Sequence, residues 1–165
     1  MISVLMLILV MIATGSKRRA FQLLKLRPDL QIINIRGNVD TRLRKMEEQQ
    51  LDGIVLAAAG LKRLGMEDVI TQEDMISAPA QGALALEVRE DQKELQKMLD
   101  VFCDEETMNE VCAERNFLEQ MGGSCHTPAG ARCQKTDQGY ELYAMFGNED
   151  GSKQAYTKVY GTCPE

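Results

Sequence analysis

The first sixty residues alternate between apolar runs and amphipathic segments, and this alternation is the feature that most restricts the fold. The apolar runs occupy residues 1–13, 30–35 and 51–59, and the segments with helical spacing occupy residues 17–26 and 40–49. Strands and helices that alternate in this way form a parallel sheet with right-handed crossovers. The uninterrupted run at residues 54–57 is typical of a central strand covered on both faces. We therefore expect an α/β domain.

The second half of the chain has a different pattern. Residues 78–82 (Ala-Pro-Ala-Gln-Gly) break the alternation, residues 83–88 suggest another strand, and residues 90–120 have helical periodicity. At residues 140–146, Tyr140, Leu142, Ala144 and Phe146 alternate as one face of a strand, and residues 155–160 follow a turn as an antiparallel partner. We expect a small α+β domain with an antiparallel sheet, so that residues 1–77 form one domain and residues 91–165 another.

Nine Lys and Arg residues lie between residues 14 and 45 against only Asp29 and Asp40, although the whole chain has a net charge of −6. In an acidic protein, one concentrated basic segment favours a discrete anionic ligand over nucleic acid. Phe21 is the only aromatic residue among these charges in the sequence, so the segment lacks the aromatic side chains on which nucleic-acid bases stack.

Four arginines of this segment follow the first two predicted strands, beside Thr14, Ser16 and Gly37; they are Arg18, Arg19, Arg36 and Arg42. Ligands of parallel sheets bind at the carboxyl ends of the strands, and arginine matches carboxylates and phosphates with a bidentate fork. The pattern indicates an anion site without separating phosphate from carboxylate. Solvated helix residues are the alternative interpretation. No nucleotide-binding glycine motif occurs.

Cys125 lies in the sequence Gly-Gly-Ser-Cys-His-Thr-Pro at residues 122–128. The glycines permit positive φ and leave the sulfur without bulky neighbours, and Pro128 prevents simple continuation into a helix. Two interpretations remain at this point, an idle loop cysteine and a site of covalent attachment or nucleophilic chemistry. A catalytic pair with His126 is disfavoured because adjacent residues of an extended segment point to opposite sides.

The cysteine spacing argues against both a disulfide framework and a zinc site. Five cysteines occur without a C-x-x-C pair, and His126 is the single histidine. We expect reduced thiols in a cytoplasmic protein and no metal. The apolar residues 1–13 are too short for a transmembrane helix and lack a preceding basic region, so we expect no membrane association.

Five motifs, in order, resemble the porphobilinogen deaminase (hydroxymethylbilane synthase) family. Ala-Thr-Gly-Ser-Lys-Arg-Arg at residues 13–19 resembles the family's Gly-Thr-Ser-Ser-Leu-Arg-Arg, and residues 34–43 (Asn-Ile-Arg-Gly-Asn-Val-Asp-Thr-Arg-Leu) resemble its arginine-bearing signature. Residues 56–65 (Leu-Ala-Ala-Ala-Gly-Leu-Lys-Arg-Leu-Gly) are nearly identical to its pattern. Residues 78–83 and 122–128 are similar to its Pro-x-Gly-Gln-Gly-Ala and Gly-Gly-Cys-x-x-Pro segments. The resemblance extends over nearly the whole chain.

The resemblance implies an enzyme that condenses four porphobilinogen units into hydroxymethylbilane with release of ammonia. It implies a dipyrromethane cofactor joined to Cys125 by a thioether, with porphobilinogen and oligopyrrole intermediates as partners. The residues that would hold cofactor and substrate carboxylates are Thr14, Ser16, Arg18, Arg19, Arg36, Arg42 and Gln81. The fold implied is a periplasmic-binding-protein-like second domain followed by the carboxyl-terminal domain, with residues 78–90 crossing towards a first domain.

The family's His-Ser-x-Lys-Asp motif, which carries its catalytic aspartate, does not occur in this sequence. We therefore expect a fragment of the second and third domains, without the last helix, that is inactive or impaired by itself. Gly15, Lys17 and Ala80 replace the family's Ser, Leu and Gly, and Ser124 is an insertion before the cysteine.

Two other functions are compatible with the residues. A non-enzymatic anion-binding module of the periplasmic-binding type would use the same arginines without covalent chemistry. An interaction domain would pair its apolar amino-terminal segment with another chain, and exposed strand edges would favour self-association although full-length family members are expected to be monomers.

Overall fold

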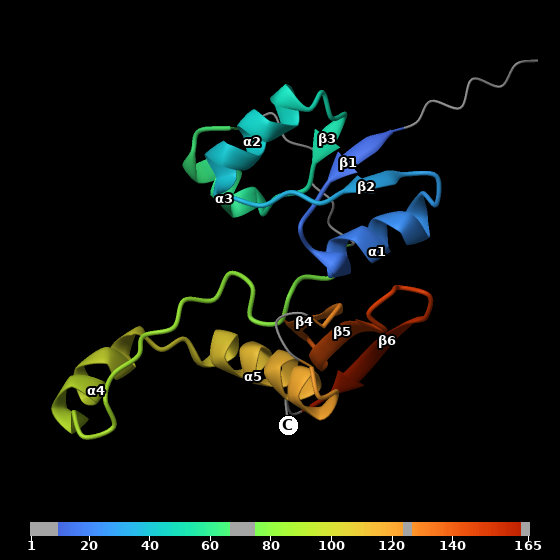
Figure 1. The fold of residues 1–165 in the computed structure, drawn as a ribbon. Coiled ribbons are helices and arrows are strands. Elements are labelled where there is room, and N and C mark those ends of the chain that lie inside the picture. Colours follow the sequence, from blue (N-terminus) through green and yellow to red (C-terminus); the bar gives the residue numbers. More distant parts are fainter. Residues whose placement is uncertain (1–9, 67–74, 124–126, 163–165) are drawn as a thin grey trace, which may run out of the picture. The chain divides into compact units, whose positions relative to one another are not determined.

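The computed structural model describes residues 10–66, 75–123 and 127–162, and the chain divides into two compact units, Met1–Met75 and Ile76–Glu165 (Figure 1). The first unit is an α/β layer structure and the second is an α+β structure, as the sequence pattern predicts. The assignment of residues 78–90 to a further domain stays a prediction. None of the described helices has the length and apolar character that a membrane crossing requires.

The first unit contains a parallel sheet of three strands in the order β2-β1-β3. The strands are β1 (Met11–Ala13), β2 (Gln31–Ile33) and β3 (Gly53–Ile54). Ile12 is paired with Ile32 on one side and Gly53 on the other. The expectation that residues 54–57 form the central strand is wrong. The central strand of this sheet is β1, and β3 ends at Ile54, before the helix that begins at Ala58.

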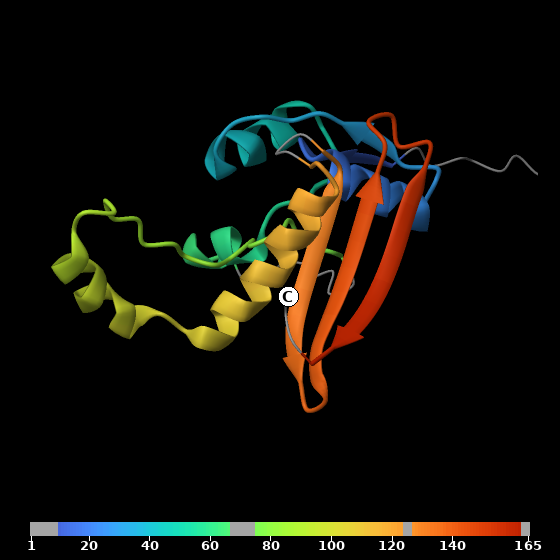
Figure 2. The ribbon, with the colours of Figure 1, turned by 90° about the horizontal axis from the view of Figure 1, so that it is seen from below.

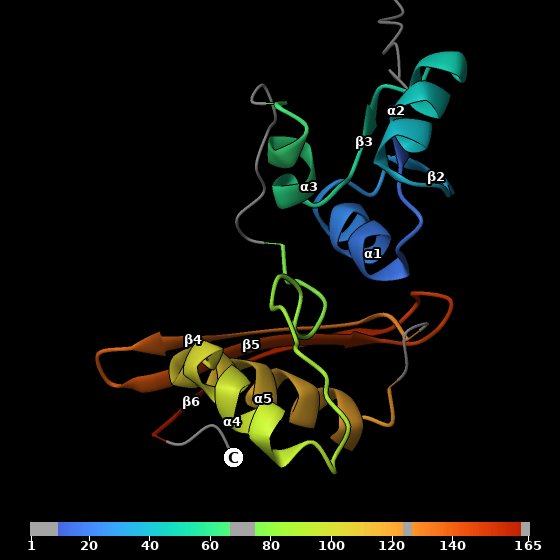
Figure 3. The same cartoon turned by 90° about the vertical axis from the view of Figure 1, so that its left-hand side faces the viewer.

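Side-chain caps fix the beginnings of the two long helices in this unit, α1 (Lys17–Leu26) and α2 (Val39–Glu48). Ser16 Oγ accepts a hydrogen bond from the N–H of Arg19, and Asn38 Oδ1 accepts one from the N–H of Thr41 at 2.9 Å. Such caps satisfy N–H groups that have no partner within a helix. The two crossovers run in opposite directions across the sheet, so right-handed connections put α1 and α2 on opposite faces (Figure 3).

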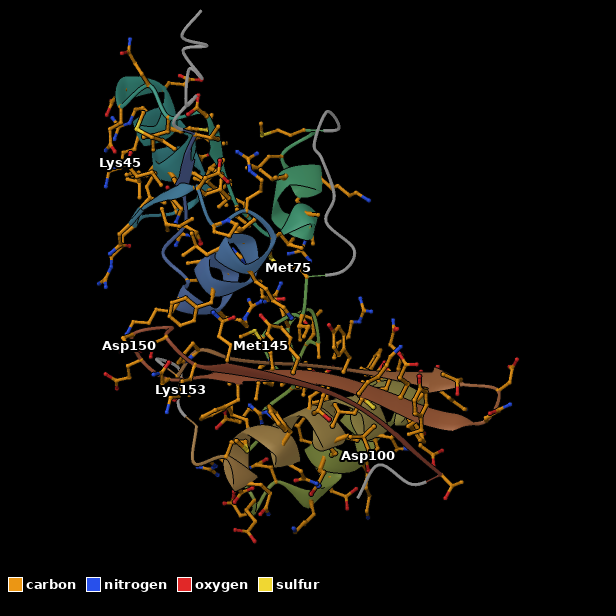
Figure 4. All side chains as sticks on the ribbon, turned by 90° about the vertical axis from the view of Figure 1, so that its right-hand side faces the viewer. Lys45, Met75, Asp100, Met145, Asp150 and Lys153 are labelled. Carbon is orange, nitrogen blue, oxygen red and sulfur yellow. The ribbon has the colours of Figure 1, made fainter. Side chains whose placement is uncertain are left out.

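The second unit is built on an antiparallel meander in the order β4-β5-β6 (Figure 2). Its strands are β4 (Ala129–Thr136), β5 (Gly139–Gly147) and β6 (Gln154–Gly161). The predictions for β5 and β6 are confirmed, whereas β4 was not predicted. A turn that carries Asp150 and Lys153 joins β5 to β6 (Figure 4), and Asn148 closes it by accepting the N–H of Lys153 at 2.9 Å.

The helical region that precedes the meander is divided into three pieces, α4 (Lys93–Leu99), the 3₁₀ turn η1 (Asp100–Phe102) and α5 (Glu105–Gln120). The interruption occurs because Asp104 caps α5, its Oδ1 accepting the N–H of Thr107 at 2.7 Å. Helix α5 packs on the sheet over small side chains of its inner face, and Ala131 and Ala144 there are fully buried.

The strand expected at residues 83–88 is not formed, and residues 83–89 have no regular secondary structure. Leu84 and Leu86 are 89% and 63% exposed. A strand needs a neighbour for its backbone N–H and C=O groups, and within the described ranges no strand pairs with this segment.

Candidate anion-binding site

The carboxyl ends of β1, β2 and β3 lie at one edge of the first unit's sheet, because all three strands are parallel. Hydrogen bonds continue past the strand ends: the N–H of Thr14 donates to Ile33 O at 2.9 Å, and the N–H of Val55 donates to Ala13 O at 3.0 Å. The segments that follow the strands are therefore held beside each other, at the place where ligands of parallel sheets bind.

The turn between β1 and α1 is packed closely against the chain that follows β2. Thr14 is 4% exposed, and its Oγ1 accepts the N–H of Ser16 at 3.2 Å. A Cβ atom at Gly15 would lie 2.7 Å from the carbonyl oxygen of Ile35. The two hydroxyls therefore organise the turn and the start of α1.

Arg18 and Arg19 bring two positive charges to the first turn of α1. Arg18 is 7% exposed, and burial, together with the charge of Arg19, lowers the pKa of its guanidinium to about 10. Burial and the charge of Arg42 lower the pKa of Arg19 as well. Nη1 of Arg19 donates to the carbonyl oxygen of Val55 at 3.1 Å. Mutually repelling cations in a partly desolvated place favour the binding of an anion.

The loop between β2 and α2 is held by cations of α2. Nε of Arg42 donates to Gly37 O at 2.6 Å, and Nζ of Lys45, seen in Figure 4, donates to Arg36 O at 3.1 Å. Gly37 has a φ of +133°, a conformation that side chains disfavour. Sequence reasoning missed Lys45, although its place one turn after Arg42 on the same helix was a visible signal.

The structure thus brings together, at one sheet edge, most of the residues singled out in the first unit: Thr14, Ser16, Arg18, Arg19 and Arg42. Arg36 is exposed on the adjoining loop. Gln81 belongs to the second unit, and Cys125 and His126 lie outside the described residues. The ligand roles of all these residues stay predictions.

Gln81 lies in a turn with an unusual backbone. Its Oε1 accepts the N–H of Ala78 at 3.4 Å, and its own N–H donates to Ala78 O at 3.0 Å. Ala80 has a φ of +60°, and its N–H donates to Oε2 of Glu114 at 2.6 Å. Sequence reasoning missed Glu114, for which the signal was the four-residue spacing of Glu106, Glu110 and Glu114 on one helix.

The described cysteines do not form a metal site. In the part of the chain that the structure covers, no group of three or more His, Cys, Asp or Glu side chains could hold a metal ion. Cys103 and Cys112 are exposed, whereas Cys133 is buried. Burial, with the charges of Glu110 and Glu114, raises the pKa of the Cys133 thiol to about 11.

Two family models match the chain. Residues 8–97 match "Porphobilinogen deaminase, dipyromethane cofactor binding domain" and residues 108–165 match "Porphobilinogen deaminase, C-terminal domain". Among curated relatives, the porphobilinogen deaminase of Lachnospira eligens is 48% identical over 93% of this chain and 55% of its own length. Those of Clostridioides difficile and Bacillus cereus (strain G9842) are 43% and 46% identical over 91% and 93% of this chain. The chain spans about half the length of these relatives, 51% and 52% for the latter two.

Proposed function

The chain belongs to the porphobilinogen deaminase family, and we propose that its residues provide the part of that enzyme which holds the dipyrromethane cofactor and the growing pyrrole chain. The reaction assigned to the whole enzyme is the condensation of four porphobilinogen units into hydroxymethylbilane with loss of ammonia. The observation that carries the proposal is the cationic cluster of Arg18, Arg19 and Arg42 at the sheet edge.

This cluster fits a ligand rich in carboxylates. Each pyrrole carries an acetate and a propionate side chain, and guanidinium forks bind carboxylates through paired N–H groups. Burial and the charges of neighbouring arginines lower the pKa of Arg18 and Arg19, and bound carboxylates would offset that repulsion. We assign carboxylate binding to Thr14, Ser16, Arg18, Arg19, Arg36, Arg42 and Gln81.

We assign the covalent attachment of the cofactor to Cys125. When bound, the dipyrromethane supplies the primer to which pyrrole units are added. The buried Cys133 is a poor competitor for attachment, because its raised pKa keeps the thiol protonated. We also propose a cytoplasmic location, which the free thiols of Cys103, Cys112 and Cys133 support.

Intact mass spectrometry tests this assignment. The chain is expressed in cells that make porphobilinogen, and the wild type is expected to carry a mass increment of two pyrrole units that is absent from Cys125→Ser. Cys112→Ser is the matched control and keeps the increment. An increment that persists in Cys125→Ser, or none in the wild type, overturns the attachment site. Saturable binding of porphobilinogen without any adduct would instead support a non-enzymatic anion-binding module.

We further propose that these 165 residues alone do not sustain turnover, because a carboxylate is needed to stabilise the cation formed when ammonia leaves and the His-Ser-x-Lys-Asp motif is not in this sequence. An assay of ammonia release from porphobilinogen decides this point. Robust release by the purified chain contradicts the proposal.

A further inference from the structure

Glu114 is a buried carboxylate with two backbone partners that are far away in the sequence. It is 7% exposed. Its Oε1 accepts the N–H of Cys133 at 2.8 Å, and its Oε2 accepts the N–H of Ala80 at 2.6 Å. One side chain of α5 therefore fastens both β4 and the turn that contains Gln81. Hydrogen bonds to a charged acceptor are stronger than those between neutral groups.

The contact is part of a regular arrangement along the outer edge of β4. Three alternate residues of β4 donate their N–H groups away from β5. The acceptors are Ser77 O for Ala131 at 3.0 Å, Glu114 Oε1 for Cys133 at 2.8 Å and Glu110 Oε1 for Lys135 at 2.8 Å. One helical turn separates Glu110 from Glu114, and this step matches two residues of a strand.

Glu114 differs from Glu110 in one respect, because it also binds the turn at residues 78–82. The residue that it holds there, Ala80, is in the left-handed region with a φ of +60°, which costs free energy in any residue except glycine. Such a conformation persists only where surrounding contacts impose it. The 2.6 Å bond to Glu114 is such a contact, and Gln81 is the next residue.

We propose that Glu114 is a positioning residue for Gln81, because it holds the turn that contains Gln81 against α5 and β4. The proposal rests on the proposed function in so far as Gln81 serves a pyrrole ligand. Both of these hydrogen bonds of Glu114 are accepted from backbone N–H groups, so its effect on the ligand is exerted through the turn.

The charges around Glu114 come from α5 and β4. Burial raises the pKa of its carboxyl, as does the charge of Glu110, whereas the N–H groups of Cys133 and Ala80 and the charge of Arg132 lower it; the net direction is upward. The thiol of Cys133 lies close enough for the charge of Glu114 to raise its pKa. Residues 77–82 contain no titratable side chain.

An NMR titration of the full chain tests the contact without any mutation. The amide protons of Ala80 and Cys133 are expected to shift with one common midpoint, above the ordinary pKa of glutamate. In Glu114→Gln both shifts disappear, and in the control Glu110→Gln both remain while Lys135 changes. Independent midpoints at Ala80 and Cys133, or titration that survives in Glu114→Gln, would overturn the proposal.

The position of Gln81 is measured in the same spectra. In Glu114→Gln we expect hydrogen exchange of the Ala80 amide to become about tenfold faster and the Gln81 side-chain amide to broaden, while Glu110→Gln leaves both as in the wild type. Unchanged Gln81 signals in a folded Glu114→Gln protein would contradict a positioning role. A missing pyrrole adduct in the wild type would refute the proposed function and leave this result unaffected.

Discussion

Nη1 of Arg19 lies 3.1 Å from the carbonyl oxygen of Val55, so that the first turn of α1 is joined to the end of β3 by a guanidinium. The planar fork of arginine can keep this bond while other N–H groups meet a carboxylate, whereas the compact ammonium of lysine cannot span both partners. The hydrogen bond therefore fixes the direction of the fork at the sheet edge.

We expect Arg19→Lys to bind porphobilinogen about tenfold more weakly than the wild type, because a charge-assisted hydrogen bond is lost at unchanged net charge. Isothermal titration calorimetry measures the affinity. Arg44→Lys is the control, since Arg44 lies exposed in a pair with Glu48 on the next helix. Equal affinities for wild type and Arg19→Lys would remove Arg19 from the site.

Gly15→Ser restores the residue that the family pattern has at this position, and we expect it to destabilise this chain. The new Cβ would lie 2.7 Å from Ile35 O, which is backbone and cannot rotate away. Overpacking of this kind costs about 1–3 kcal/mol. Thermal unfolding followed by circular dichroism measures the loss.

The matched control is Gly60→Ala in α3 (Ala58–Arg63). Its new Cβ would meet only a methyl group of Val39 at 3.8 Å, an ordinary contact. Alanine favours a helix over glycine, so this variant should gain about 0.5–1 kcal/mol. If Gly15→Ser is as stable as the wild type, the turn is less tightly packed against Ile35 than we describe.

Elements with local signals could be predicted from sequence. The helix at Lys17–Leu26 was predicted with its bounds because the capping residues Thr14 and Ser16 precede it and Pro28 follows it; the structure shows that Ser16 is the cap. That the arginines gather at one edge of the sheet was predictable as well, since strand ends in a parallel sheet converge without any knowledge of side-chain contacts; their ligand role stays a prediction. The individual hydrogen bonds between these cations and carbonyl oxygens could not be predicted, because they depend on how helix and loop pack.

Elements that depend on distant partners were missed or wrong. Strand β4 contains no Val, Ile or aromatic residue, and it exists because β5 pairs with it and carboxylates of α5 bind its outer edge. Residues 83–88 alternate like a strand but have no partner among the described residues. The spacing of Glu106, Glu110 and Glu114 indicates one helix face, but the partners of Glu114 could not be predicted, because the N–H groups that it binds lie 19 and 34 residues away.

Ala80→Gly is expected to stabilise the chain. Glycine adopts the observed φ of +60° without the steric cost that alanine bears, and this gain exceeds the extra entropy of glycine in the unfolded chain. The expected net gain is about 0.5–1 kcal/mol in the free energy of unfolding by urea. Ala78→Gly has no such strain to relieve and should lose a similar amount. A loss in both variants would mean that Ala80 is not strained.

Cys133 is expected to resist alkylation in the folded chain. Its thiol is buried, with a pKa raised to about 11, so at pH 7.5 its thiolate fraction is roughly three hundredfold smaller than that of an ordinary cysteine. The raised value means that the fold favours the neutral thiol. This contribution to stability is full below the ordinary pKa and is lost as the pH rises towards 11.

Iodoacetamide labelling followed by peptide mass spectrometry measures this difference residue by residue. Cys103 and Cys112 are exposed and should react within the native protein, while Cys133 should react only after denaturation or as the pH approaches 11. Because Cys133 N–H is bound by Glu114 at 2.8 Å, Glu114→Gln should loosen the outer edge of β4 at this residue and speed labelling of Cys133. Glu110→Gln, which leaves that bond in place, should affect labelling less. Native labelling of Cys133 at the rate of Cys112 would contradict the packing of α5 on β4.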